Sequence, residues 1–232
     1  MRLFHRVILQ ILSLLLLTLF SVSTLQAHQM RPAIVTISFE QDAVVKVQIE
    51  TNAEAVLSGI GSEHENTDDA PQVEVYRELR ELPSVVLVEK FKSIAGQFSQ
   101  GLSLQLGGQQ VQWQFININV PEVGDTRLSR KSEIYYSAKI PTGASTAIWS
   151  FDQKYGDAVV NFISQGQIEK TTYWLVKGQP SPEYYLYEKV IPRSWSAVAL
   201  DYVGLGYIHI LPKGLDHILF VLGLFLLSKK FK

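Results

Sequence analysis

The sequence contains no cysteine among its 232 residues. Disulfide bonds, thiolate zinc sites, iron–sulfur clusters and cysteine nucleophiles are therefore excluded, and any metal site must use histidine, carboxylate or backbone ligands. Charge is also scarce, since Asp, Glu, Lys and Arg make up 19% of the chain and the formal net charge is −1. Phosphate binding needs a concentrated excess of Lys and Arg, so nothing in the composition favours a nucleic-acid partner.

Enzyme motifs are missing as well. The chain has no Gly-x-Ser-x-Gly elbow, no Gly-rich phosphate loop, no His-Glu-x-x-His and no EF-hand loop. We therefore expect a protein that is not an enzyme. An exported metallohydrolase using Asp216 and His217 is disfavoured, because a hydrolase needs a soluble cleft and these residues adjoin a long apolar run.

The first 27 residues have the pattern of an export signal. Basic residues precede an apolar run from Val7 to Phe20, and small and polar residues lead to Ala27. This predicts a signal peptide over residues 1–27. The alternative is an uncleaved N-terminal membrane helix, for which the apolar run is short. Cleavage would leave His28 first, where the amine and imidazole together suit a metal ion, although an ordinary strand start is the other interpretation.

Residues 28–178 favour a mainly β fold, an antiparallel β-sandwich-like extracytoplasmic domain. Short runs rich in β-branched and aromatic residues alternate with clusters of Gly, Pro, Asn and Asp. Residues 54–57 suggest a helical turn, and residues 73–82 a short amphipathic helix or a strand. His64 in an acidic loop suggests either a cation site or a solvated loop. The predicted strands, the first two of which form a hairpin, cover residues 34–39, 44–49, 100–106, 111–120, 132–140, 147–151, 158–163 and 171–176.

After residue 178 the composition changes. Residues 179–200, with two prolines near their start, predict a linker or interfacial segment, and residues 201–232 predict a membrane segment. Its apolar part, from Leu215 to Phe231, has seventeen residues, enough at 1.5 Å per residue to cross most of a bilayer core of about 30 Å. We expect a C-terminal transmembrane α-helix. Aromatic residues suited to a membrane interface precede this run and lysines close it, namely Trp195, Tyr202, Tyr207, Lys229, Lys230 and Lys232.

The terminal lysines favour the cytoplasmic side, and the signal peptide places the preceding domain outside. We therefore expect a bacterial-type inner (cytoplasmic) membrane protein whose N-terminal domain is periplasmic.

Ionisable residues gather at the start of this apolar run. His209, Asp216 and His217 lie at a membrane boundary, where such groups are costly and mark a site by default. Pro212 and Gly214 predict a break that would let them converge from two half-segments. Imidazole with carboxylate suits Ni²⁺, Co²⁺ or Zn²⁺. The alternative is that Asp216 caps a helix and both histidines are solvated.

Residues 204–227, GLGYIHILPKGLDHILFVLGLFLL, resemble the first membrane segment of the HupE/UreJ proteins. These are hydrogenase and urease accessory permeases associated with nickel or cobalt uptake. Ala27-His28 and Pro32-Ala33 resemble the start of the branch that carries a large exported domain. The resemblance implies that His209, Asp216 and His217 contact the metal, with His28 a weaker candidate.

The resemblance also bears on what the chain does alone. Family members continue into further hydrophobic helices, and one span cannot enclose a transport path. We expect either a fragment of a permease or a tethered module that pairs with further membrane helices or other chains. The implied function is nickel or cobalt binding or uptake for metalloenzyme maturation, with the lipid bilayer and a divalent metal ion as partners. The alternative is an exported protein-interaction or assembly module anchored by one helix, without transport.

Overall fold

The computed structural model describes residues 31–64, 66–126, 128–187, 195–210, 219–220 and 222–223. The chain divides after residue 188 into two units. The first unit holds all the strands, and the second holds helix α5, Trp195–Ile210. The predicted signal peptide over residues 1–27 lies outside the described residues.

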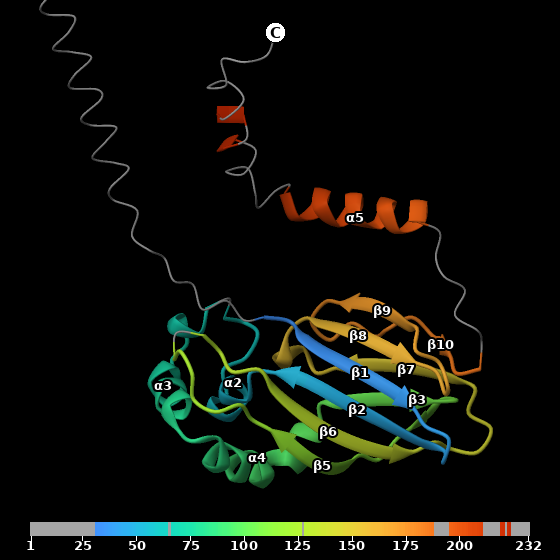
Figure 1. The fold of residues 1–232 in the computed structure, drawn as a ribbon, viewed down its shortest axis with the longest axis horizontal. Coiled ribbons are helices and arrows are strands. Elements are labelled where there is room, and N and C mark those ends of the chain that lie inside the picture. Colours follow the sequence, from blue (N-terminus) through green and yellow to red (C-terminus); the bar gives the residue numbers. More distant parts are fainter. Residues whose placement is uncertain are drawn as a thin grey trace, which may run out of the picture. The chain divides into compact units, whose positions relative to one another are not determined.

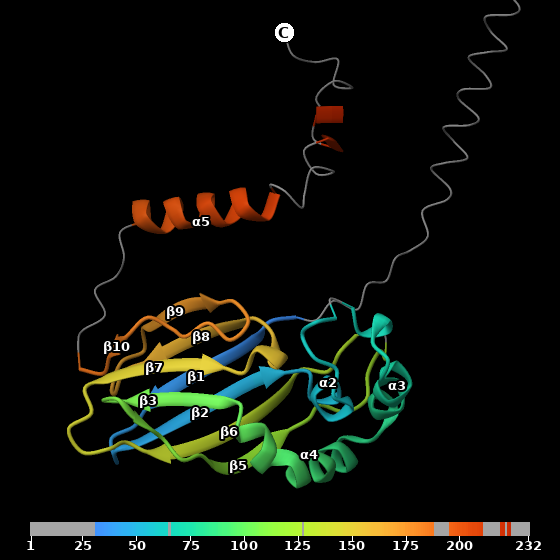
Figure 2. The ribbon, with the colours of Figure 1, turned by 180° about the vertical axis from the view of Figure 1, so that it is seen from behind.

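The first unit is mainly β, as predicted. It contains a six-stranded sheet in the order β5-β6-β2-β1-β8-β9 and a four-stranded sheet in the order β10-β7-β3-β4. Figure 1 shows the six-stranded sheet in front, and Figure 2 brings the other sheet forward. The strands are β1 Ala33–Phe39, β2 Val44–Thr51, β3 Leu102–Leu106, β4 Gln109–Gln110, β5 Gln114–Asn119, β6 Ser132–Lys139, β7 Thr146–Phe151, β8 Ala158–Ile163, β9 Lys170–Leu175 and β10 Tyr184–Tyr185.

The predicted hairpin of the first two strands is confirmed. β1 and β2 pair in antiparallel register, with Val35 opposite Ile49 and Ile37 opposite Val47. These four side chains are fully or almost fully buried, while their neighbours along each strand are more accessible. The alternation of the sequence therefore sets which face of the sheet points to the core.

The sheets are mostly antiparallel, as predicted, but one pair of strands departs from that arrangement. β1 and β8 run parallel, with Ala33 opposite Ala158 and Ile37 opposite Phe162. The hairpin partner β2 occupies one side of β1, and its other side accepts a strand from far along the chain. Side-chain alternation specifies the buried face of a strand but neither its neighbour nor its direction, so the sequence pattern could not reveal this pairing.

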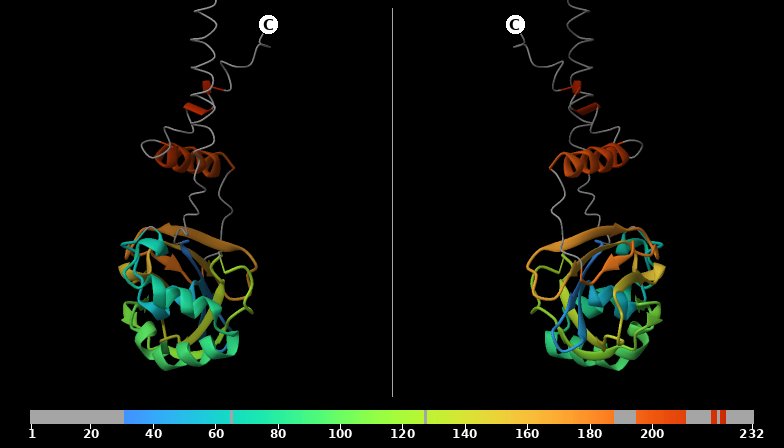
Figure 3. Two further views of the ribbon diagram at one scale, coloured as in Figure 1. Left: turned by 90° about the vertical axis from the view of Figure 1, so that its left-hand side faces the viewer. Right: turned by 90° about the vertical axis from the view of Figure 1, so that its right-hand side faces the viewer.

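Helix α4, Ser84–Ser99, was not predicted. Its start is rich in valine, which favours strands, but Leu87, Phe91, Ala95 and Phe98 recur at helical spacing and are all buried. The ring of Phe98 reaches both sheets, with ring centroids 6.3 Å from Tyr136 of β6 and 6.2 Å from Phe151 of β7. Helix α4 thus seals one side of the core, and Figure 3 shows the domain from its two ends.

Two shorter helices precede α4. Helix α2, Ala53–Ser58, confirms the predicted helical turn. Residues 73–82, whose pattern allows a helix or a strand, form helix α3, Val73–Glu81. Tyr76, Leu79 and Arg80 share the buried face of α3, because residues three and four positions apart lie on one side of a helix. Single 3-10 turns cover Thr67–Asp69 and Gln153–Tyr155.

The segment after residue 178, assigned to a linker from its prolines, begins by packing on the four-stranded sheet. Trp149 donates its backbone N–H to Ser181 Oγ at 3.0 Å, and the Ser181 N–H donates back to the Trp149 carbonyl at 2.7 Å. Tyr184 pairs with Ala147, and its ring stacks on Phe162 with centroids 4.6 Å apart. The fold of the first unit therefore includes residues up to Leu186, which is 3% exposed.

Helix α5 of the second unit has sixteen mostly apolar residues, with Asp201 among the few polar ones, and no single apolar face. It exposes Trp195, Leu200, Tyr202 and Val203, each more than two thirds accessible. Among the described residues, no helix combines the length and hydropathy needed to cross a membrane. Most of the predicted span from Leu215 to Phe231 lies outside the described residues.

Candidate functional site

The sequence-predicted metal residues fall at the margin of the described structure. His209 lies in the last turn of helix α5, with its side chain outside the description. Asp216, His217 and His28 lie outside the described residues altogether. In the parts of the chain that the structure describes, no three His, Asp or Glu side chains gather as a metal ligand set. The metal site therefore stays a prediction.

The described residues contain a different candidate, a pocket of about 230 Å³ where β1 begins and β2 ends. Helix α2 forms one wall. Asn52 is its N-cap and accepts the Ala55 N–H through Oδ1 at 3.1 Å. Gly59 ends the helix at φ 76°, a left-handed conformation that glycine adopts without strain, and its N–H bonds back into the last turn. Both ends of this short helix are fixed by residue type.

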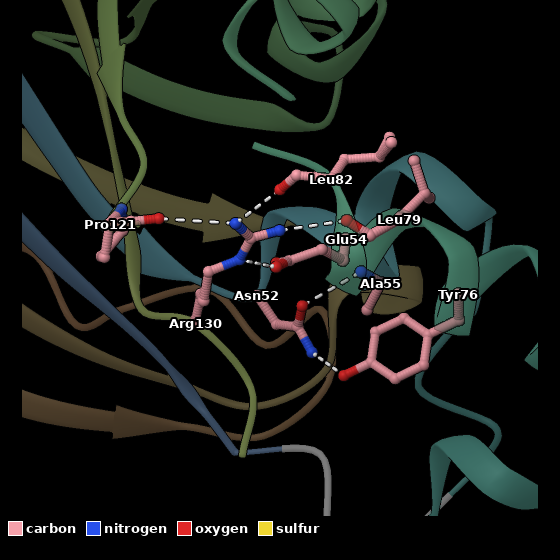
Figure 4. A network of polar contacts seen from close by, with 8 residues as sticks. All are labelled: Asn52, Glu54, Ala55, Tyr76, Leu79, Leu82, Pro121 and Arg130. Carbon is pink, nitrogen blue, oxygen red and sulfur yellow. Dashed lines mark hydrogen bonds and ion pairs between the residues drawn. The ribbon is translucent and has the colours of Figure 1, made fainter. Parts of the chain in front are cut away.

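A buried ion pair lies behind that wall. Arg130, 9% exposed, donates through Nε to Oε1 of Glu54, which is fully buried, at 2.5 Å. Its Nη1 donates to the carbonyl of Leu82 at 3.0 Å and its Nη2 to that of Leu79 at 3.0 Å. Figure 4 shows the guanidinium at the centre of this network, with the Pro121 carbonyl as a further acceptor at 3.5 Å.

The arginine thereby joins three segments far apart in sequence. It neutralises the carboxylate of α2, and it donates to two carbonyls at the end of α3, of which that of Leu79 also accepts the Leu82 N–H at 3.3 Å. Oε2 of Glu54 is buried with no hydrogen-bond partner among the described residues. Arg130 is therefore the group that compensates the buried negative charge of Glu54.

The network extends to Tyr76 on the other side of α2. Asn52 donates its side-chain amide to the Tyr76 hydroxyl at 2.8 Å, so one residue both caps α2 and ties it to α3. The Arg80 guanidinium lies 5.2 Å from the centroid of the Tyr76 ring. Burial raises the pKa of Tyr76 above the ordinary value, and outweighs the Asn52 hydrogen bond and the Arg80 charge, which lower it. The phenol is a structural group, neutral over the physiological range.

The pocket itself has an apolar interior and a cationic rim. Aliphatic side chains from β1, β8, α2 and the residue after its C-cap line the pocket, as does Tyr155. Lys131 and Lys154 have side chains 59% and 49% exposed, and both lie on the lining, as does the exposed Arg31. The aliphatic residues are Ile34, Val56, Ile60 and Val159.

The lysines have carboxylate partners near the surface. Lys131 Nζ lies 2.8 Å from Oε1 of Glu50, and Lys154 Nζ lies 3.4 Å from Oδ2 of Asp152. Lys154 also lies 4.9 Å from the centroid of the Tyr155 ring. Burial lowers the pKa of Lys154, but the nearby Tyr155 and Asp152 outweigh that effect and leave the pKa above the ordinary value. The lysine is therefore a stable positive charge at the rim.

The sequence patterns did not reveal this pocket. Its charged residues come from the start of β1, from β2, from the segment before β6 and from the 3-10 turn Gln153–Tyr155, and only the fold places them together. One signal was present: Glu54 is the single charge in Ala53-Glu54-Ala55-Val56-Leu57, and a carboxylate inside an apolar turn indicates a buried partner.

The comparisons with known proteins concern the other end of the chain. No curated protein matches it as a relative. The C-terminal segment, which contains His209, Asp216 and His217, does resemble a known family. The motif resemblance found in the sequence is confirmed there, because residues 187–232 match the family model described as HupE / UreJ protein.

Proposed function

We propose that this chain is a membrane-anchored protein that binds nickel or cobalt ions, or contributes to their uptake, through its C-terminal segment. The observation that carries the proposal is the HupE / UreJ match over residues 187–232. Within it, Asp216 and His217 are the primary ligands and His209 the third. Imidazole and carboxylate are suitable ligands for both ions, and the chain has no thiol to compete with them.

The composition of helix α5 supports a membrane location for this segment. The helix is mostly apolar, and its described residues expose large apolar side chains. A helix of this kind is stable where lipid or other helices cover it. We place the first unit on the periplasmic side and the terminal lysines in the cytoplasm, in agreement with the lysine bias of cytoplasmic membrane flanks.

Calorimetric titration of the detergent-solubilised full chain with NiCl₂ and CoCl₂ tests the metal site. We expect saturable binding that weakens between pH 7.5 and pH 5.5, because a metal-ligating imidazole must be neutral. His217→Ala should lower the affinity at least about tenfold, since even groups outside the first ligand shell contribute that much.

The matched control is His64→Ala, which removes an imidazole from the first unit. It should leave nickel binding unchanged. If wild type and His217→Ala bind nickel identically, or neither binds it, the metal proposal is wrong. That result would favour the alternative of an assembly module. If only His209→Ala is silent, the site rests on Asp216 and His217.

The absence of cysteine gives a clean test of topology. Ile168 is 98% exposed on the first unit, so Ile168→Cys creates a single accessible thiol. A membrane-impermeant maleimide applied to intact spheroplasts should label it. Ser228→Cys, just before the terminal lysines, should react only after lysis. The reverse labelling pattern would overturn the orientation.

A further inference from the structure

The pocket beside helix α2 has the two chemical features of a binding site for a small amphipathic ligand. Its interior is apolar, with Ile60 nine-tenths or more buried and Val56 and Val159 partly buried. Its rim is cationic. Pockets that bind drug-sized ligands measure roughly 300–1,000 Å³, so a volume of about 230 Å³ suits a smaller molecule.

The charges around the pocket leave one positive charge in excess. Four cationic side chains line it, namely Arg31, Arg130, Lys131 and Lys154, against the single carboxylate of Glu50. Two more carboxylates lie behind the lining, where Glu54 pairs with Arg130 and Asp152 with Lys154. Counting those partners, four cations face three carboxylates, which complements a ligand that carries one negative charge.

The cationic side chains differ in whether their nitrogens are available to bind a ligand. All three guanidinium nitrogens of Arg130 already donate to protein oxygens, so this lining residue has no nitrogen without a partner to offer a ligand. In the Lys131–Glu50 pair, the lysine side chain is 59% accessible and the glutamate side chain 28%. Exposed ion pairs contribute little, so Lys131 can reorient towards a ligand carboxylate at small cost.

We propose that this pocket binds a small organic monocarboxylate. Its apolar body lies against Val56, Ile60 and Val159, and its carboxylate lies at the rim formed by Lys131, Lys154 and Arg31. The ligand is a free carboxylic acid whose apolar body is about the size of one amino-acid side chain. This binding site belongs to the first unit and does not depend on the metal site of the C-terminal segment.

Three probes that share one apolar body test the proposal. These are 4-phenylbutyrate, 4-phenylbutan-1-ol and 4-phenylbutylamine, titrated calorimetrically into the full chain, with empty micelles as the blank. The carboxylate should bind saturably and at least about tenfold more tightly than the alcohol, because a hydrogen bond to a charged group adds that much affinity. The amine should not bind saturably.

Variants of the rim locate the binding. Lys131→Met and Lys154→Met should each weaken 4-phenylbutyrate binding several-fold, and the double variant at least about tenfold. Lys92→Met is the matched control, because Lys92 is a similarly exposed lysine that pairs with Glu89 on helix α4, outside the pocket lining. Val159→Phe fills the interior and should reduce the affinity of the carboxylate and the alcohol alike.

The outcomes separate cleanly. Equal binding of the three probes would show partition into apolar surface and overturn the proposal, as would equal effects of Lys92→Met and Lys131→Met. No saturable binding of 4-phenylbutyrate would overturn it too. Loss of nickel binding in His217→Ala bears only on the C-terminal proposal, so the two can fail separately.

Discussion

Arg130 and Glu54 form an ion pair inside the first unit, with Arg130 9% and Glu54 0% exposed. The two residues lie 76 positions apart, and their contact joins helix α2 to the segment that leads into β6. Because Arg130 also satisfies the carbonyls of Leu79 and Leu82, the pair fixes the end of α3 as well. One side chain thus links helix α2 and the end of α3 to the segment before β6.

Arg130→Met should lower the free energy of unfolding by about 3–5 kcal/mol, because it leaves Glu54 as a buried charge without compensation. Adding Glu54→Leu should recover part of the loss but not all, since the carbonyls of Leu79 and Leu82 still lose their hydrogen bonds from Arg130. Urea denaturation of the full chain, followed by tryptophan fluorescence, measures both. Lys92→Met, which breaks an exposed pair, should change stability by less than about 1 kcal/mol. Equal losses in the single and double variants would contradict a charge-based role.

Asn52 has two roles that variants can separate. Tyr76→Phe removes the hydrogen bond from the Asn52 amide and should cost about 1 kcal/mol. Asn52→Ala removes that bond and the N-cap of α2, and should cost about 2 kcal/mol. Denaturation curves of the two variants give the comparison. If both cost the same, the cap contributes nothing measurable.

Tyr184 anchors the segment after residue 178 to the sheets. Tyr184→Ala removes the stack on Phe162 and should destabilise the first unit by about 3–5 kcal/mol. The neighbouring Tyr185 is 46% exposed, and Tyr185→Ala should change stability by no more than about 0.5 kcal/mol. Thermal unfolding monitored by near-ultraviolet circular dichroism distinguishes them. Similar small shifts for both would show that residues 179–187 are dispensable to the fold.

Stability should fall in alkali because buried phenols resist ionisation. Burial raises the pKa of Tyr136 far above the ordinary value, and raises those of Tyr76 and Tyr155 as well. In the unfolded chain these phenols ionise near pH 10, whereas in the folded chain they stay protonated to higher pH. The unfolded state then binds fewer protons, so the free energy of unfolding decreases as the pH rises above about 10.

Tyr136→Phe tests the source of this slope. The variant should be less stable than wild type at pH 8, since it loses the hydrogen bond of 2.7 Å from the hydroxyl to the Ala95 carbonyl. Above pH 10 its stability should decline less steeply. Urea denaturation midpoints between pH 8 and pH 11 give the stability difference at pH 8 and the slope of stability above pH 10. An unchanged slope would assign the loss of stability in alkali to other groups.

Local sequence patterns predicted most of the strands. The alternation in Ile34 to Phe39 and Val44 to Ile49 specified two strands and their buried faces, because a strand places successive side chains on opposite sides. The sequence patterns did not predict helix α4, because its valines favour a strand while its core positions have helical spacing. There, packing of Leu87, Phe91 and Phe98 against both sheets decided the conformation over local propensity.

By itself, the sequence determined the β character of the domain, the C-terminal family resemblance and the His209, Asp216 and His217 motif, because each is carried by residues close together in the chain. Only the tertiary structure decided the parallel β1–β8 pairing, the Glu54–Arg130 contact and the pocket at whose rim Lys131 and Lys154 lie. The physical reason is that these features join residues far apart in sequence. Their contacts form when burial of a shared apolar core brings the two sheets and helix α4 together.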